Sequence, residues 1–189
     1  STYKSLGGPA GGLIVTNDPD IAQSLDAIAF PGMTANFDAA KSAALAVTML
    51  DWRDHGKAYA AQMIDVSMKL AEALHGLGLP VFAAEQGFTR SHQFAIEAAG
   101  FGGGQAISQA IRKAGFLACG IGLPLPEIAG DMNGLRIGTP ELVRWGVGPE
   151  HVERLATLIA SAIRSDRPET LLAETSAFRQ EFDRLHYIS

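Results

Sequence analysis

Cysteine, aromatic residues and clustered basic charge are all scarce in this sequence. Cys119 is the only cysteine among 189 residues, so no disulfide can form within the chain, and a reducing cytoplasm is the expected location. The net charge is −5 and lysines and arginines do not cluster, which argues against a nucleic-acid partner. No uninterrupted apolar run is long enough to cross a membrane. The five histidines lack the spacing of metal ligands, so no metal site is expected.

Small and aliphatic residues dominate what is present. Hydrophobic residues make up 47% of the chain and aromatic residues only 7%, and there are 21 glycines. This length and composition suffice for one domain with a hydrophobic core and a second small lobe. Abundant alanine and glycine suit helices that pack closely on a sheet.

Apolar periodicity and turn residues predict the order of elements along the chain. Helices are expected over residues 18–30, 38–52, 57–75, 105–114, from 140 onward, 149–163 and 168–187, and strands over residues 12–16, 80–83, 91–97, 116–119 and 134–139. Asp18 and Thr139 are typical helix-capping residues. The helix over 38–52 is apolar on nearly all sides, which predicts burial. His55 and Gly56 should end it, and we expect a lobe boundary there.

Residues 1–12 place one lysine, Lys4, among small hydroxylated residues and before a turn rich in glycine. Small neighbours allow a bulky group to approach the side chain, and paired glycines allow a tight backbone turn. A lysine held in such a crevice loses solvation, which favours its neutral form. Neutral lysine is the nucleophile that forms a Schiff base with an aldehyde. An ordinary surface charge is the alternative for a lone lysine.

This stretch resembles the signature of the serine hydroxymethyltransferases, in which a Thr/Ser-rich run, a His, the Schiff-base Lys and a Gly-Pro-Arg-Gly-Gly turn follow one another. The matching residues are Lys4, Gly8, Pro9, Gly11 and Gly12, whereas Tyr3 replaces the histidine and Ala10 the arginine. The family consists of pyridoxal-phosphate enzymes with the aspartate-aminotransferase-like fold. The resemblance implies that Lys4 is catalytic and binds pyridoxal 5′-phosphate, with Ser1 and Thr2 beside it as further cofactor contacts.

A second motif surrounds Arg136, in the segment over residues 134–141. An arginine between apolar residues at the end of a strand needs an anion, and a planar guanidinium holds a carboxylate by two parallel hydrogen bonds. If this motif is considered alone, a structural ion pair between Arg136 and an Asp or Glu is the simpler interpretation. The segment also resembles the G-[IL]-R-[ILV]-G-T-P segment of the same family, which implies that Arg136 binds the α-carboxylate of the amino-acid substrate.

The resemblance continues through residues 30–32 and 91–93, which look like the family's F-P-G and N-H-x segments. In the family, the glycine-rich loop after F-P-G cradles the phosphate of the cofactor in the partner subunit. By this resemblance Gly32, Thr34 and Asn36 are cofactor-binding candidates, although Thr34 and Asn36 are equally typical of a turn. A loop that reaches into a neighbouring site implies a homodimer or a higher assembly.

The resemblance also implies the fold class, which is α/β with an α+β small lobe, the C-terminal half of an aspartate-aminotransferase-like fold. Residues 1–55 would end the large, cofactor-binding domain and residues 56–189 would form the small C-terminal domain. The lysine of this family falls near mid-chain, so we expect a longer protein whose N-terminal half is missing here. The chain alone is expected to be inactive.

The implied chemistry makes or breaks the Cα–Cβ bond of a β-hydroxy amino acid. The first interpretation is hydroxymethyl transfer between serine and glycine with tetrahydrofolate, and the alternative is a folate-independent aldolase or transaldolase acting on threonine-like or α-methylserine-like substrates. Ala10, Trp145 after a retained Arg144, and the segment over 119–122 depart from the family pattern, which argues against folate more than against the cofactor. A non-catalytic remnant and a nucleotide-binding module at the glycine-rich turn over 100–104 are the rivals.

Overall fold

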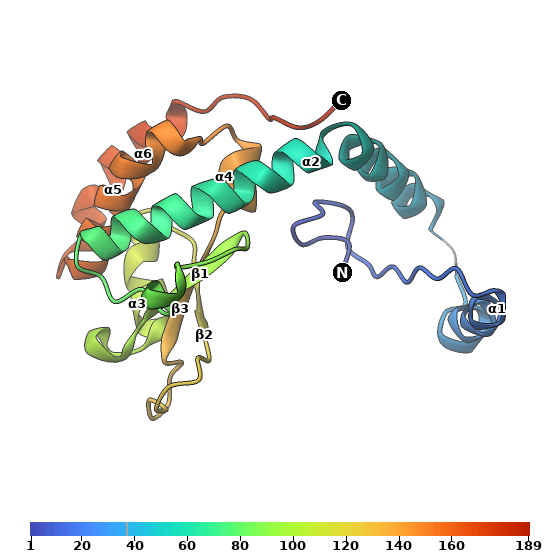
Figure 1. The fold of residues 1–189 in the computed structure, drawn as a ribbon, viewed down its shortest axis with the longest axis horizontal. Coiled ribbons are helices and arrows are strands. Elements are labelled where there is room, and N and C mark those ends of the chain that lie inside the picture. The colour runs from blue at the N-terminus through green and yellow to red at the C-terminus, as the bar shows by residue number, and fades with distance from the viewer. Residues whose placement is uncertain (37) are drawn as a thin grey trace. The chain divides into compact units, whose positions relative to one another are not determined.

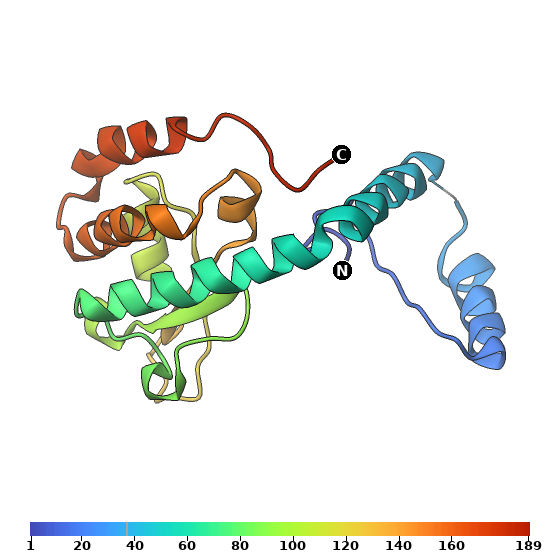
Figure 2. The same ribbon diagram turned by 45° about the horizontal axis from the view of Figure 1, so that its top comes forward.

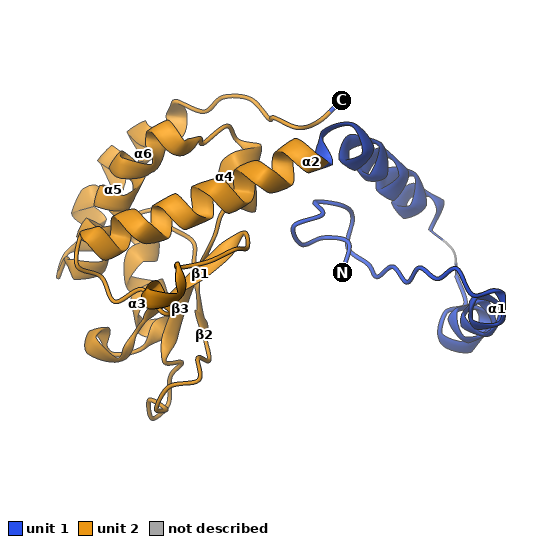
Figure 3. Ribbon diagram, in the orientation of Figure 1, with its two compact units in different colours: residues 1–56, 189 blue, residues 57–188 orange. Residues whose placement is uncertain are grey.

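The computed structural model describes residues 1–36 and 38–189, and the chain divides into two compact units (Figure 3). Unit 1 comprises residues 1–56 with Ser189, and unit 2 comprises residues 57–188. Phe37, the last residue of the loop predicted after the F-P-G segment, lies outside the described residues.

Unit 1 contains the first helix, α1, over Pro19–Ala27. It begins as predicted, because the Asp18 carboxylate accepts hydrogen bonds from the backbone N–H groups of Asp20 and Ile21, at 2.9 and 3.0 Å. A π-helical turn over Ile28–Met33 follows, and within it Phe30 leaves the helical region, with φ −143° and ψ 126°. The helix therefore ends at the F-P-G segment, as the sequence predicts.

The strand predicted over residues 12–16 is wrong. These residues form no strand, and Ile14 and Val15 are 72% and 82% exposed. A strand forms only where a neighbouring strand can satisfy its backbone hydrogen bonds, and the described part of unit 1 offers none. The segment is apolar, as the sequence shows, but its side chains are not buried against the described residues.

Helix α2 runs over Ala39–Gly76 without the predicted break at Gly56. A Cβ on Gly56 would lie 2.6 Å from the Trp52 ring, so this glycine makes room for the indole and does not end the helix. The predicted burial of residues 38–52 is also wrong, since Val47 and Leu50 are 58% and 47% exposed.

Unit 2 is built around a three-stranded antiparallel sheet, of order β1-β3-β2 (Figures 1 and 2). Its strands are β1 (Gln93–Glu97), β2 (Cys119–Ile121) and β3 (Gly134–Gly138), and its helices are the second part of α2 with α3 (Gly104–Arg112), α4 (Pro140–Arg144), α5 (Val152–Arg164) and α6 (Leu172–Gln180). The predicted apolar stripe of α2 is buried, with Tyr59, Met63, Val66, Leu70 and Leu74 all in the core. Antiparallel pairing agrees with the α+β expectation for this lobe.

The sheet has one covered face and one open face. Phe94 and Ile96 on β1 and Leu135 and Ile137 on β3 are buried. Arg136, between the last two, is exposed. Successive side chains of a strand point to opposite faces, so the helices bury the face of Leu135 and leave that of Arg136 accessible.

Three predicted elements in unit 2 differ from the structure. The strand over 80–83 is reduced to one bridge between Val81 and Ile96, because Ala83 turns the chain with φ 58°. The strand predicted over 116–119 begins only at Cys119. The last helix ends at Gln180 and follows a 3₁₀ turn over Pro168–Leu171.

The glycine-rich turn over 100–104 packs closely against the rest of unit 2. A Cβ on Gly104 would collide with the backbone oxygen of Gly134, so only glycine fits there. The Asp131 carboxylate accepts hydrogen bonds from the N–H groups of Gln105 and Ala106, at 2.8 and 3.0 Å. A carboxylate of the chain itself thus occupies the N-terminus of α3, which argues against the nucleotide-binding alternative.

Replacing Asp131 by asparagine should lower the melting temperature by about 2–4 °C at neutral pH. The hydrogen bond from Gln105 is the main cause that lowers the pKa of Asp131. Because its folded-state pKa is depressed, the stabilisation is present above the ordinary carboxyl pKa and disappears as the pH falls through the lowered value. Thermal unfolding of D131N and wild type should therefore converge in acid. Asp166→Asn, at an exposed carboxylate, should show no difference at either pH.

Candidate functional site

The segment that carries Lys4 is a closed loop in unit 1. The Thr2 N–H donates to the Gly11 oxygen at 3.0 Å, its hydroxyl donates to the Pro9 oxygen at 2.5 Å, and its own carbonyl accepts from Gly8 at 2.7 Å. Thr2 is 2% exposed. This residue, predicted as a cofactor contact, therefore ties the two ends of the loop together.

Two glycines explain the shape of the loop. Gly7 has φ 73°, a backbone conformation that favours glycine. A Cβ on Gly8 would lie 2.9 Å from the Thr2 carbonyl oxygen. The tight turn predicted next to the lysine is present, and it requires glycine at these positions.

Trp52 of α2 anchors the loop, because its indole N–H donates to the Leu6 carbonyl oxygen at 2.7 Å. The Lys4 side chain itself is exposed, with its Nζ 5.3 Å from the centroid of the Tyr3 ring. The expected crevice is therefore absent from the described part of unit 1. The structure shows a held backbone that presents an accessible amine, and Ser1 beside it is exposed as well.

The predicted phosphate-binding residues lie in and just after the π-helical turn. A Cβ on Gly32 would lie 3.0 Å from the Ala27 oxygen. The Thr34 N–H and hydroxyl both donate to the Ala29 carbonyl oxygen, at 3.0 and 2.6 Å. Thr34 thus has its donors engaged in the turn, whereas Asn36 is exposed. Gly32 and Thr34 are exposed as well.

Arg136 stands at the middle of β3, directly opposite Ala95 of β1 and Cys119 of β2. The residues two positions away on its own strand are Gly134 and Gly138, so the positions directly beside the guanidinium on the open face are small, while Gln93, Glu97 and Ile121 lie diagonal to it on the same face. No carboxylate within residues 1–36 and 38–189 forms an ion pair with it. The structural ion pair considered from the sequence therefore lacks a partner in the described chain, and all five donors stay available for an anion.

Thr139, immediately after β3, was expected to cap the following helix, but its side chain makes no cap hydrogen bond. Its buried hydroxyl lies 2.8 Å from the Met63 carbonyl oxygen of α2 and 3.2 Å from that of His92. Its N–H donates to the same His92 oxygen at 2.9 Å. Thr139 thus ties the end of β3 to α2 and to the start of β1, three residues after Arg136.

Thr139→Val, which keeps the shape and removes the donor, should lower the free energy of unfolding by about 1–3 kcal/mol. It should also raise the KM for an amino acid severalfold, since the strand that carries Arg136 loses its tether. Urea denaturation and steady-state kinetics of the full-length protein measure both effects. Thr139→Ser should restore most of each.

Ser67 supplies the matched control, because its buried hydroxyl has no hydrogen-bond partner among the described residues. Ser67→Ala should be neutral or stabilising, since it removes an unsatisfied polar group from the core. If Thr139→Val were as well tolerated as Ser67→Ala, the tether would have no energetic role.

Arg144 has a structural role in unit 2. Its guanidinium carbon lies 4.3 Å from the centroid of the Tyr59 ring, and its Nη1 donates to the Tyr187 carbonyl oxygen at 2.7 Å. The Tyr59 hydroxyl donates to the Pro140 carbonyl oxygen at 2.8 Å, and burial raises the pKa of this tyrosine. These contacts join α2, α4 and the C-terminal segment, and they were not foreseen from the sequence.

Metal ligands do not gather anywhere in the part of the chain that the structure describes, where no three His, Cys, Asp or Glu side chains could hold an ion. None of the helices over these residues combines the length and hydrophobicity that crossing a bilayer demands.

Comparison with known proteins identifies the family of this chain. The sequence model of the serine hydroxymethyltransferase family matches residues 1–159, more than four fifths of the chain. This chain belongs to the serine hydroxymethyltransferase family. The resemblance recognised in the lysine and arginine motifs is thereby confirmed.

Two kinds of relative share the family. The chain is 59% identical to an alpha-methylserine aldolase of Ralstonia sp, over all of this chain and 43% of the relative. It is 35% identical to the serine hydroxymethyltransferase of Methanopyrus kandleri, over 99% of this chain and 44% of that protein. The chain thus spans less than half the length of these curated relatives.

Among solved structures, the chain matches an L-threonine transaldolase from Pseudomonas fluorescens, crystallised in its internal aldimine state, with a TM-score of 0.82 and 25% identity. The match covers 99% of this chain and 43% of that one. The expected fold class, the C-terminal half of an aspartate-aminotransferase-like enzyme, is confirmed.

Proposed function

We propose that this chain is part of a pyridoxal-phosphate enzyme that cleaves or forms the Cα–Cβ bond of an α-methylserine-like amino acid without folate. The observation that carries the proposal is the 59% identity to an alpha-methylserine aldolase, against 35% to a serine hydroxymethyltransferase. From the sequence alone, hydroxymethyl transfer was the first interpretation. The higher identity to the aldolase favours the alternative, a folate-independent aldolase.

The residues present fit the cofactor at the lysine. Lys4 presents an accessible amine on a loop whose backbone is held by Thr2 and Trp52, with the Tyr3 ring 5.3 Å from its Nζ. Pyridoxal phosphate, when bound, supplies an electron sink for the charge that develops at Cα. Thr34 has its donors engaged, so we propose Asn36 before Thr34 as the phosphate contact of this loop.

Arg136 supports the amino-acid part of the proposal. Its guanidinium, which forms no ion pair within the described residues, can hold the α-carboxylate of the substrate by two charge-assisted hydrogen bonds. The residues directly beside it on the sheet, Gly134, Gly138, Ala95 and Cys119, are small and leave room for that carboxylate. Holding the carboxylate fixes the orientation of the bond that breaks. This orientation would be the contribution of Arg136 to the reaction rate.

The test uses the full-length enzyme with pyridoxal phosphate and α-methylserine, whose retro-aldol cleavage gives alanine and formaldehyde. Formaldehyde should appear at the same rate with and without tetrahydrofolate. Cleavage of serine that depends strictly on tetrahydrofolate would instead support the second candidate, hydroxymethyl transfer, which the family match favours. A folded, cofactor-free protein that turns over neither amino acid would support the non-catalytic remnant.

We further propose that the intact enzyme is a homodimer or a higher assembly, located in the cytoplasm. Unit 1 carries several large apolar side chains that are exposed in the described chain: Ile14, Val15, Phe30, Met33, Val47 and Leu50. Such surface is costly in water and typical of an interface. Light scattering of the full-length enzyme should show at least two copies, and a stable, fully active monomer would contradict this.

A further inference from the structure

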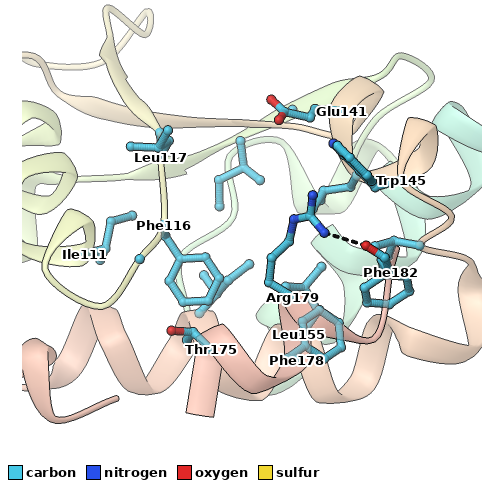
Figure 4. Close-up of a pocket in the computed structure, with 17 residues that line it drawn as sticks. Ile111, Phe116, Leu117, Glu141, Trp145, Leu155, Thr175, Phe178, Arg179 and Phe182 are labelled. Carbon is cyan, nitrogen blue, oxygen red and sulfur yellow. Dashed lines mark hydrogen bonds between the residues drawn. The ribbon is translucent and has the colours of Figure 1, made fainter. Parts of the chain in front are cut away.

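Unit 2 contains a cavity of about 350 Å³ on the covered side of its sheet (Figure 4). Its wall comes from α3, the loop over 115–118, β3, α4, α5 and α6. Apolar side chains dominate it, including Ile111, Phe116, Ile137, Leu155 and Phe178. A volume of this size, lined mostly by apolar groups with a few polar ones, is typical of small-molecule sites.

One cation is held at this cavity. The Arg179 guanidinium stacks on the Trp145 ring, 4.0 Å from its centroid, and Nη1 donates to the Phe182 carbonyl oxygen at 2.6 Å (Figure 4). Stacking and this bond fix the plane of the fork and engage one of its five N–H groups. The remaining donors stay available for a ligand.

Arg154 on α5 differs from Arg179 in having a carboxylate partner. It also lies over an aromatic ring, that of Phe178, at 5.0 Å, but its Nη1 donates to the Glu181 carboxylate at 2.6 Å. Arg179 forms no ion pair within the described residues. Glu141 also lines the cavity but forms no ion pair with Arg179 in the described chain. An oriented guanidinium without an ion-paired carboxylate, at the edge of a mostly apolar cavity, is complementary to an anion with an apolar tail.

We propose that this cavity is a second binding site, for a small carboxylate that carries an apolar chain. The carboxylate binds Arg179, and the chain lies against Phe116, Leu155 and Phe178. Ile137, which lines the cavity, and Arg136, the proposed substrate anchor, are neighbours on β3 and point to opposite faces of the sheet. The site is therefore distinct from the proposed amino-acid site.

Calorimetric titration of the full-length enzyme with octanoate tests the proposal. We expect one octanoate bound per chain, with much weaker binding of butanoate, which lacks the apolar length, and of octanol, which lacks the charge. Arg179→Gln should weaken octanoate binding by about tenfold to a hundredfold. Arg154→Gln, which removes a stacked but ion-paired arginine outside the cavity wall, should leave it unchanged.

A second variant keeps the test valid if Arg179→Gln is unstable. Ala118 lines the cavity and is half-buried, so Ala118→Phe should fill part of the volume and weaken octanoate with Arg179 intact. The proposal is overturned if wild type binds no octanoate, if octanol binds as tightly, or if stable Arg179→Gln binds octanoate normally. Arg136→Ala should still bind octanoate, so the failure of either proposed site leaves the other untouched.

Discussion

Replacement of Lys4 by alanine should lower the activity of the full-length enzyme by about a thousandfold or more, because the chain then lacks the amine that attaches the cofactor. Borohydride reduction should fix pyridoxal phosphate covalently to wild type and not to K4A. The visible absorbance of the bound cofactor should be lost in parallel.

The structure indicates that the loss of activity in K4A would not come from unfolding. The Lys4 side chain is exposed, with its Nζ 5.3 Å from the centroid of the Tyr3 ring, while the loop around it is held through Thr2, Gly8 and Trp52. Its loss should therefore leave the melting temperature nearly unchanged. Lys41, an exposed lysine of the same unit, is the matched control, and K41A should retain both cofactor and activity. A fully active K4A enzyme would remove the basis of the proposed chemistry.

Arg136→Ala and Arg136→Lys should both cripple the enzyme through substrate binding. Loss of a bidentate, charge-assisted pair is worth about 2–3 kcal/mol, or roughly 30-fold to 150-fold in affinity for the amino acid. Lysine keeps the charge but not the planar fork, so it should restore little. Binding of glycine or α-methylserine, followed through the cofactor spectrum, measures the loss directly.

The alternative, a structural arginine, predicts unfolding instead. Arg136 is exposed and makes no ion pair within the described chain, so both variants should melt near the wild-type temperature. Arg112→Ala, at an exposed arginine of α3, controls for lost surface charge. A stable R136A enzyme that binds amino acid normally would show that the carboxylate is held elsewhere.

Local features of the fold could be predicted from the sequence alone. Asp18 and Pro19 start α1, the F-P-G segment ends it, and alternation along residues 93–97 marks β1. Each depends on steric or hydrogen-bonding preferences within a few residues. The Lys4 and Arg136 motifs could be found in the same way, because the family pattern is a run of neighbouring residue types.

Other features depend on residues far apart in the chain, and the tertiary structure alone decided them. Asp131 caps α3 through the N–H of Gln105, 26 residues away. Thr139 looked like a cap, yet its hydroxyl donates to Met63, 76 residues earlier. The apolar segment around Val15 looked like a buried strand, but burial depends on which residues cover it. A sequence determines which groups need a partner, and only folding determines which distant residue supplies it.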